Sequence, residues 1–133
     1  MRTLIMLSAS AMAAVLALVV GCSDSASPGV EPEVTNVADS FQYQVTGVQN
    51  YTGQSDYMWP NSGVQANVNQ STTIVGGDIG LVILDAVGTQ VYARSLGDNG
   101  TFLTAVGIPG SWTIRIDYSS ASGTVNFRVQ KRP

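Results

Sequence analysis

The sequence predicts an all-β domain, and three observations carry that prediction. Between residues 39 and 133, Val, Ile and Thr together occur 26 times, whereas Ala, Leu, Met, Lys and Glu together occur 11 times. The first group favours strands and the second favours helices. Apolar and polar residues alternate along several segments, and turn residues recur about every 8–12 positions. Such a chain folds as an antiparallel sandwich or barrel, for which we expect about seven to nine strands.

The first part of the domain contains two alternating segments. Phe41, Tyr43 and Val45 alternate with polar residues, and so do Val64, Ala66 and Val68. This period of two predicts half-buried strands at both places. Residues 50–62 are less regular, and we interpret them as a long loop with one short strand around residues 56–59.

The middle of the domain contains three further strands. Residues 80–85 read GLVILD, a continuous apolar run that predicts a central strand. A turn at residues 85–88 leads to a strand over residues 90–95. The tripeptide Asp98-Asn99-Gly100 is a strong hairpin signal, because Asn and Gly tolerate positive φ angles. It predicts a strand over residues 101–106, and Pro109-Gly110 turns the chain again.

The last two segments alternate most regularly. The residues predicted to face the core are Trp112, Ile114, Ile116 and Tyr118 in one segment and Val125, Phe127 and Val129 in the other. Residues 119–123 are expected to join these segments as a hairpin loop. Arg115 and Arg128 would then lie on the outer face with Asp117 nearby, as a solvated ion pair or as a patch for an anionic ligand.

The N-terminus reads as a signal helix for export. Arg2 precedes the uncharged run Leu4–Val20, and the end of this run, together with the next two residues, reads Val19-Val20-Gly21-Cys22. This pattern resembles the lipobox of bacterial lipoproteins. The resemblance implies a signal peptide over residues 1–21, cleavage after Gly21 and lipidation of Cys22, whose acyl chains would anchor the protein in a membrane. The alternatives are a plain secretory signal with an incidental Cys, or a single-pass anchor.

The segment after the Cys predicts a spacer. Residues 22–38 contain two prolines, three acids and no aromatic residue, so they are expected to form a flexible tether ahead of a domain at residues 39–133. The residue after Cys22 is Ser23 rather than the Asp that retains enterobacterial lipoproteins in the inner membrane. We therefore expect a bacterial cell-envelope location, with the outer membrane favoured.

One resemblance concerns the domain itself. The segments GLVILD, DAVGTQV, GSWTIRIDY and SGTVNFRV, within residues 80–129, are similar to the bacterial pre-peptidase C-terminal domain. That resemblance implies a jelly-roll-like β-sandwich, and function only by analogy. The chain departs from the family because no protease is attached, and because it lacks an acidic pair near Phe41 like that of related calcium-dependent modules.

The composition excludes several kinds of chemistry. The chain has no His, one Cys and one Lys, so Ser–His and Cys–His catalysis and His- or Cys-cluster metal sites are excluded. After signal removal five positive and nine negative residues remain, a balance that argues against a nucleic-acid partner. We expect no enzyme activity and no cofactor.

Two sets of residues are candidates for binding. Asp78, Asp85 and Asp98 lie in expected turns, where carboxylates and carbonyls could hold calcium, although turn formation alone explains them. Tyr51, Tyr57 and Trp59 form an aromatic cluster in a polar stretch. Exposed rings of this kind bind sugars or protein partners, whereas alternation would instead place Tyr57 and Trp59 in the core.

Together these features predict a lipid-anchored, non-catalytic β-sandwich that serves as a binding or structural accessory module of the cell envelope. Its expected partners are the membrane, through the N-terminal lipid, and a protein or polysaccharide of the envelope. The alternatives are a carbohydrate-binding module that uses the aromatic segment and, less favoured, a small hydrolase.

Overall fold

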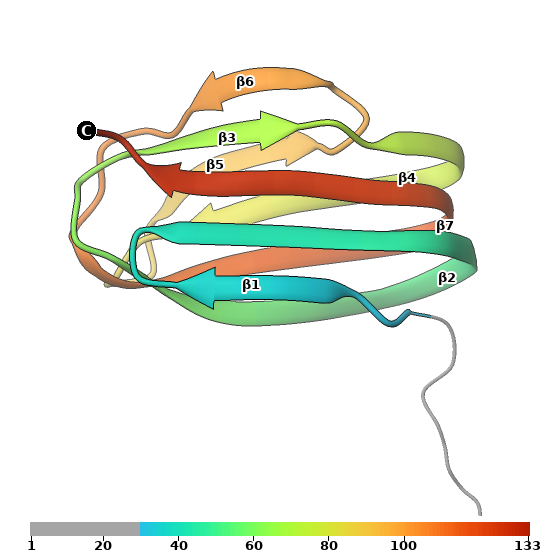
Figure 1. Cartoon of the computed structure of the whole chain (residues 1–133), viewed down its shortest axis with the longest axis horizontal. Coiled ribbons are helices and arrows are strands. Elements are labelled where there is room, and N and C mark those ends of the chain that lie inside the picture. The colour runs from blue at the N-terminus through green and yellow to red at the C-terminus, as the bar shows by residue number, and fades with distance from the viewer. Residues whose placement is uncertain (1–29) are drawn as a thin grey trace, which may run out of the picture.

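The structure, a computed structural model, describes residues 30–133 and is built entirely from antiparallel strands in that range (Figure 1). The strands are β1 (Glu33–Val37), β2 (Ser40–Asn61), β3 (Ala66–Gln70), β4 (Thr73–Leu84), β5 (Gln90–Ser95), β6 (Gly100–Leu103) and β7 (Gly110–Lys131). The prediction of an all-β antiparallel domain and of its strand number is therefore confirmed. The signal helix expected over residues 1–21 lies outside the described residues.

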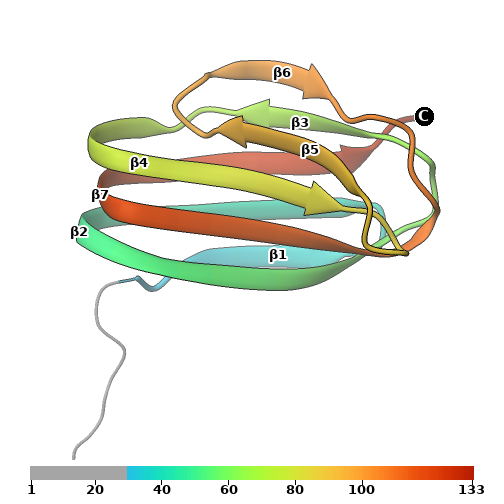
Figure 2. The same ribbon diagram turned by 180° about the vertical axis from the view of Figure 1, so that it is seen from behind.

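The sheet folds over to form two layers. The front layer, nearest the viewer in Figure 1, has the order β1, residues 40–45 of β2, residues 125–131 of β7, β3 and β6. The back layer, nearest the viewer in Figure 2, has the order residues 53–61 of β2, residues 110–118 of β7, β4 and β5. Each long strand therefore serves both layers, and the result is a jelly-roll-like β-sandwich.

The core lies between these layers and follows the predicted alternation. All seven residues of the last two segments that were expected to face inward are buried, from Trp112 to Val129. The continuous apolar run Gly80–Leu84 pairs with β5 on one side and β7 on the other, which confirms it as a central strand. The hydroxyl groups of Tyr43 and Tyr118 lie 2.6 Å apart in this interior, and burial raises the pKa of both.

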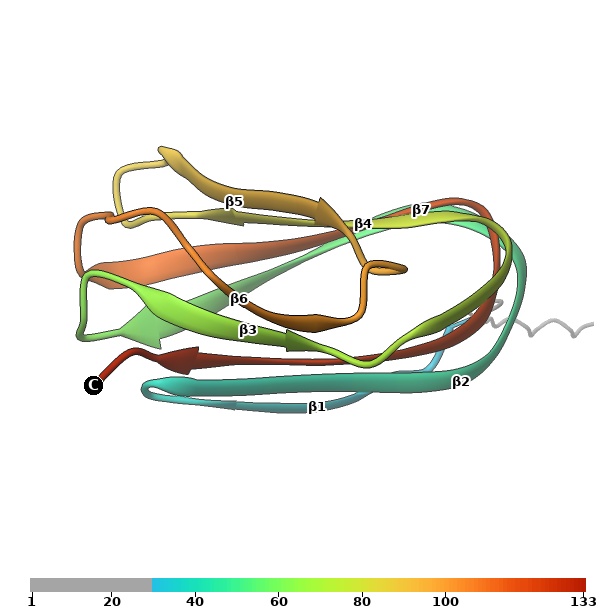
Figure 3. The same ribbon diagram turned by 90° about the horizontal axis from the view of Figure 1, so that it is seen from above.

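The expected hairpin at the C-terminus is wrong. Residues 119–123 are a bend within the single strand β7, whose two halves lie in different layers (Figure 3). Ser120 at this bend has a φ of 44°, and Gly123 has a φ of 147°. β2 bends beside it, with register shifts between Val45 and Gly53. Such bulges add local twist, which lets the paired strands cross between layers.

The interpretation of residues 50–62 as a long loop is also wrong. Residues 53–61 of β2 pair with residues 110–118 of β7 without interruption. The segment forms a strand because it hydrogen-bonds to β7, although its irregular sequence does not predict one. Strand formation depends on tertiary pairing more than on local propensity.

The range predicted for the tether overlaps the first strand. This range, residues 22–38, includes β1, which pairs with Ser40–Gln44 of β2. Val34 packs against the core from this edge strand. An edge strand needs one hydrogen-bonded neighbour and little apolar surface, so five residues of low hydrophobicity suffice here.

The two ends of the sandwich differ in content. The turn at residues 38–39, the loops at residues 62–65, 85–89 and 104–109, and the C-terminus gather at one end, called here the loop end (Figures 1 and 2). The bends of β2 and β7 and the start of β1 lie at the other, the bend end. Backbone hydrogen bonds from Gly107 to Val64 and from Ala86 to Ile108 tie the loop end together.

Candidate functional site

The aromatic segment lies in and against the core. Trp59 has no exposed surface, its ring meets Trp112 edge to face at 6.1 Å, and its Nε1 donates to the Val37 carbonyl at 3.0 Å. Tyr57 packs half-buried against Phe41 and Tyr43. The interpretation of Trp59 as an exposed binding residue is therefore wrong.

Tyr51 and Tyr57 offer little more to a ligand. The ring of Tyr51 packs edge to face on Tyr118, with centroids 5.0 Å apart. Burial raises the pKa of Tyr57. The alternation of β2 turns residues 51, 57 and 59 inward and leaves Met58 as the exposed apolar side chain of the segment, at 59%. Trp59 therefore offers no ring surface to a sugar, and Tyr51 and Tyr57 expose only part of theirs.

The three aspartates considered as calcium ligands do not meet. Asp85 lies at the loop end, where its carboxylate accepts backbone N–H groups from Val87 (3.0 Å), Thr89 (2.8 Å) and Ile108 (2.9 Å). These hydrogen bonds, led by that from Ile108, hold the pKa of Asp85 below its ordinary value of 3.8. The Asp85 carboxylate therefore joins two loops of the sandwich.

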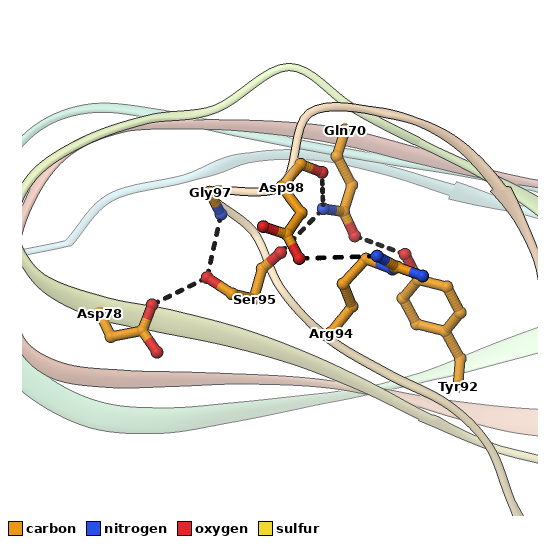
Figure 4. Close-up of polar contacts among 7 residues, drawn as sticks. All are labelled: Gln70, Asp78, Tyr92, Arg94, Ser95, Gly97 and Asp98. Atoms are coloured by element: carbon orange, nitrogen blue, oxygen red, sulfur yellow. Dashed lines mark hydrogen bonds and ion pairs between the residues drawn. The ribbon is translucent and has the colours of Figure 1, made fainter.

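Asp78 and Asp98 lie near the bend end, on either side of Ser95 (Figure 4). Asp78 Oδ1 accepts from Ser95 Oγ at 2.9 Å, and Asp98 Oδ2 pairs with Arg94 at 3.5 Å. Within residues 30–133, no three acidic, His or Cys side chains gather as they would around a metal ion. Asp78 and Asp98 instead form a hydrogen bond and an ion pair with residues of β5 beside the turn.

Beside that turn, buried polar groups close the side of the sandwich between β3 and β5. Gln70 donates from Nε2 to the carbonyls of Ser95 (3.0 Å) and Asp98 (2.7 Å), and its Oε1 accepts from the Tyr92 hydroxyl at 2.6 Å (Figure 4). Burial raises the pKa of Tyr92 to about 12. The Arg94 guanidinium lies 3.8 Å from the centre of the Phe102 ring, so a cation–π contact links β5 to β6.

The Asp85 hydrogen bonds predict an acid-sensitive contribution to stability. Because its pKa is lowered on folding, the Asp85 carboxylate stabilises the fold above about pH 4, and this contribution disappears as the pH falls through the folded-state pKa. We expect Asp85→Asn to melt at a lower temperature than wild type at pH 7. Its melting temperature should also fall less than that of wild type when the pH is lowered. Thermal melts between pH 7 and pH 2 measure this difference.

The matched control for this prediction is Asp98→Asn, which removes an exposed carboxylate near the bend end. Its melting temperature should follow that of wild type across the pH range. Equal pH dependence of Asp85→Asn and wild type would contradict the assignment to Asp85.

A cluster that the sequence analysis missed lies at the loop end. Ser62 donates its backbone N–H to Asp39 Oδ1 (2.8 Å) and its hydroxyl to Oδ2 (2.9 Å), while Lys131 Nζ donates to Ser62 Oγ (3.2 Å). The hydrogen bonds from Ser62 and the Lys131 charge lower the pKa of Asp39. Beside the cluster is an open hollow of about 400 Å³ lined in part by Ala38, Pro60, Pro109 and Gly110.

This cluster places a serine next to the one lysine of the chain, which raises the question of nucleophilic catalysis. A lysine activates a serine only as the neutral amine. Lys131 Nζ forms a salt bridge with the Asp39 carboxylate at 3.7 Å. The cluster therefore ties the β1–β2 turn to the ends of β2 and β7.

Arg115 and Arg128, which were considered as an anionic-ligand patch, lie on different layers. Arg115 is directly opposite Asp56 and donates from Nε (2.9 Å) and Nη2 (3.0 Å) to its two carboxylate oxygens. The ion-pair partner of Arg115 is therefore Asp56 on β2, and the expectation that Arg115 and Arg128 share one outer face is wrong. Arg128 is exposed on the front layer and forms no ion pair with any residue between 30 and 133.

Cys22 and Gly21, the predicted lipidation and cleavage positions, lie outside the described residues. In the described part of the chain, no helix has the length and hydrophobicity needed to span a bilayer. No protein-family model matches the sequence, and no curated protein is similar to it. The resemblances to bacterial lipoproteins and to the pre-peptidase C-terminal domain therefore remain predictions from the sequence pattern.

Proposed function

We propose that this protein is a lipid-anchored, non-catalytic module of the bacterial cell envelope that binds a partner or serves a structural accessory role. Cys22 would carry the lipid, and the outer membrane is the favoured location. The observation that supports this proposal most directly is the position of the only Cys, at the end of the uncharged run Leu4–Val20.

The geometry of the sandwich is consistent with such a role. The described chain starts at the bend end, whereas the loops and the C-terminus lie at the loop end (Figures 1 and 2). An anchor on the N-terminal side would therefore leave the loops and both outer faces available to partners.

The absence of catalysis is supported by composition and by the loop-end cluster. The chain contains no His, and Lys131 beside Ser62 is paired with Asp39. Acyl transfer by a serine needs a base that can accept its proton. A binding or structural role requires no such group.

The anchoring proposal predicts that Cys22→Ser abolishes lipidation. In a bacterial host, wild type should fractionate with membranes, and its intact mass should correspond to a chain that starts at Cys22 and carries acyl groups. The Cys22→Ser protein should carry none, because a hydroxyl does not replace the modified thiol. Mass spectrometry of both proteins measures this result.

The control is Ser25→Ala, a neighbouring change that leaves the Cys in place. It should remain acylated and membrane-bound. Acyl chains on the Cys22→Ser protein, or an unmodified wild type, would refute the proposed anchor.

A further inference from the structure

The outer face of the front layer carries six carboxamide side chains. Residues 41, 43 and 45 of β2 and residues 125, 127 and 129 of β7 are buried, so their neighbours on each strand point outward. The same alternation holds for β3. The outward carboxamides are Gln42, Gln44, Asn67, Asn69, Asn126 and Gln130.

The strand register sets these side chains in ordered rows. Thr35 is opposite Gln42, Gln42 is opposite Arg128, Arg128 is opposite Asn69, and Asn69 is opposite Thr101. One row therefore crosses all five strands of the layer that faces the viewer in Figure 1. With about 4.8 Å between strands, its outer members are roughly 19 Å apart.

Arg128 occupies the centre of this row. Its neighbours across the strands are two carboxamides, and no acidic side chain between residues 30 and 133 pairs with it. Glu33 lies at the margin of the face, in the neighbouring row that contains Gln44. The centre of the face thus offers a guanidinium that is available to an external carboxylate.

The polar and charged groups of this face favour one class of partner over others. A stable protein interface buries an apolar centre, whereas the large apolar side chains here, Val37 and Leu103, belong to the two outermost strands. A nucleic acid would require several cations, and the centre of this face holds one. Carboxamides donate and accept hydrogen bonds at once, which suits the hydroxyl and acetamido groups of a sugar chain.

We infer that the front face binds an extended acidic glycan, with Arg128 paired to a sugar carboxylate and the carboxamides bonded to hydroxyl or acetamido groups. This inference deepens the proposed function, since it rests on that function for the cellular setting and names the ligand class. The proposed glycan site includes neither the aromatic segment nor the hollow at the loop end.

Two probes test the inference on the purified full chain in mild detergent. Protease-treated peptidoglycan sacculi serve in a sedimentation assay, and soluble polygalacturonate serves in native affinity gels. We expect wild type to bind at least one of them. Preference for sacculi would identify an envelope glycan as the source of the carboxylate, and preference for polygalacturonate would identify a uronic-acid polymer.

The test variant is Arg128→Gln and its matched control is Arg115→Gln, the same change on the back layer. Arg128→Gln should weaken binding about tenfold, as expected for losing a hydrogen-bonded ion pair. Gln42→Ala should weaken it less, and Arg115→Gln should bind like wild type. Thermal melts must show that all three variants are folded.

Failure of wild type to bind both probes would overturn the inference, and so would equal binding by Arg128→Gln and Arg115→Gln. Binding only to sacculi that retain their proteins would instead indicate a protein partner and would also overturn it. Because binding is measured on purified protein, these outcomes are independent of whether Cys22 is acylated in cells.

Discussion

Replacing Trp59 by Ala is expected to lower the free energy of unfolding by about 3–5 kcal/mol. The Trp59 ring is fully buried against Trp112, and its Nε1 hydrogen bond holds the Val37 carbonyl at the end of β1. The change would leave a cavity between the layers and an unpaired carbonyl at the sandwich edge. For a domain of this size, the melting temperature should fall by roughly 10 °C or more.

The matched control is Met58→Ala, at the adjacent position on the outer face of β2. Its side chain is mostly exposed, so its truncation should change the melting temperature little. Denaturant unfolding of both variants beside wild type measures the two free energies. A larger loss for Met58→Ala would mean that the register of β2 is displaced by one residue.

Replacing Gly123 by Ala should be similarly damaging. Gly123 adopts a φ of 147°, and a Cβ atom there would lie 2.1 Å from the Thr73 carbonyl oxygen. Backbone of β4 rather than a flexible side chain would have to move at the bend of β7. We expect a loss of at least about 3 kcal/mol, since backbone strain adds to overpacking.

Gly80→Ala provides the comparison, because Gly80 also lies in a central strand. A Cβ atom at Gly80 would meet no atom within 4 Å, and its φ is not in the left-handed region. This variant should stay within about 1 kcal/mol of wild type. Chemical unfolding of the two alanine variants makes the comparison, and equal stabilities would show that the bend of β7 tolerates a side chain.

The sequence predicted the strands that have a clear local signal. Residues 90–95, which follow a predicted turn, coincide with β5, and the apolar run at residues 80–84 belongs to the central strand β4. In the bend of β2 the inward positions are Val45, Val48 and Tyr51, which are spaced by three residues instead of two. Such a change of phase looks like a loop when only local periodicity is considered, and so the continuity of β2 and β7 was missed.

The contacts between polar side chains were less accessible to prediction. Lys131 is 69 residues from Ser62, and Arg115 is 59 residues from Asp56. No local pattern joins residues so far apart, because their proximity depends on the pairing of β2 with β7. The sequence shows the outward carboxamides as the polar positions of each alternating segment. That they share one face of the sandwich could not be predicted, because it depends on the order of the strands in the sheet.

The pairing of β2 with β7 along their whole lengths has a consequence for how the chain acquires its structure. The second strand of the domain has its principal partner in the final strand, 22 residues long and ending at Lys131. Until that segment is present, β2 is joined to neither β3 nor β4, because β7 lies between them in both layers. Contacts this distant in sequence make folding slow, because the loop-closure entropy is lost before the contacts form. A chain that crosses a membrane N-terminus first would therefore stay unfolded until its last residues emerged, and one shortened before Gly110 would lack the strand that connects both layers.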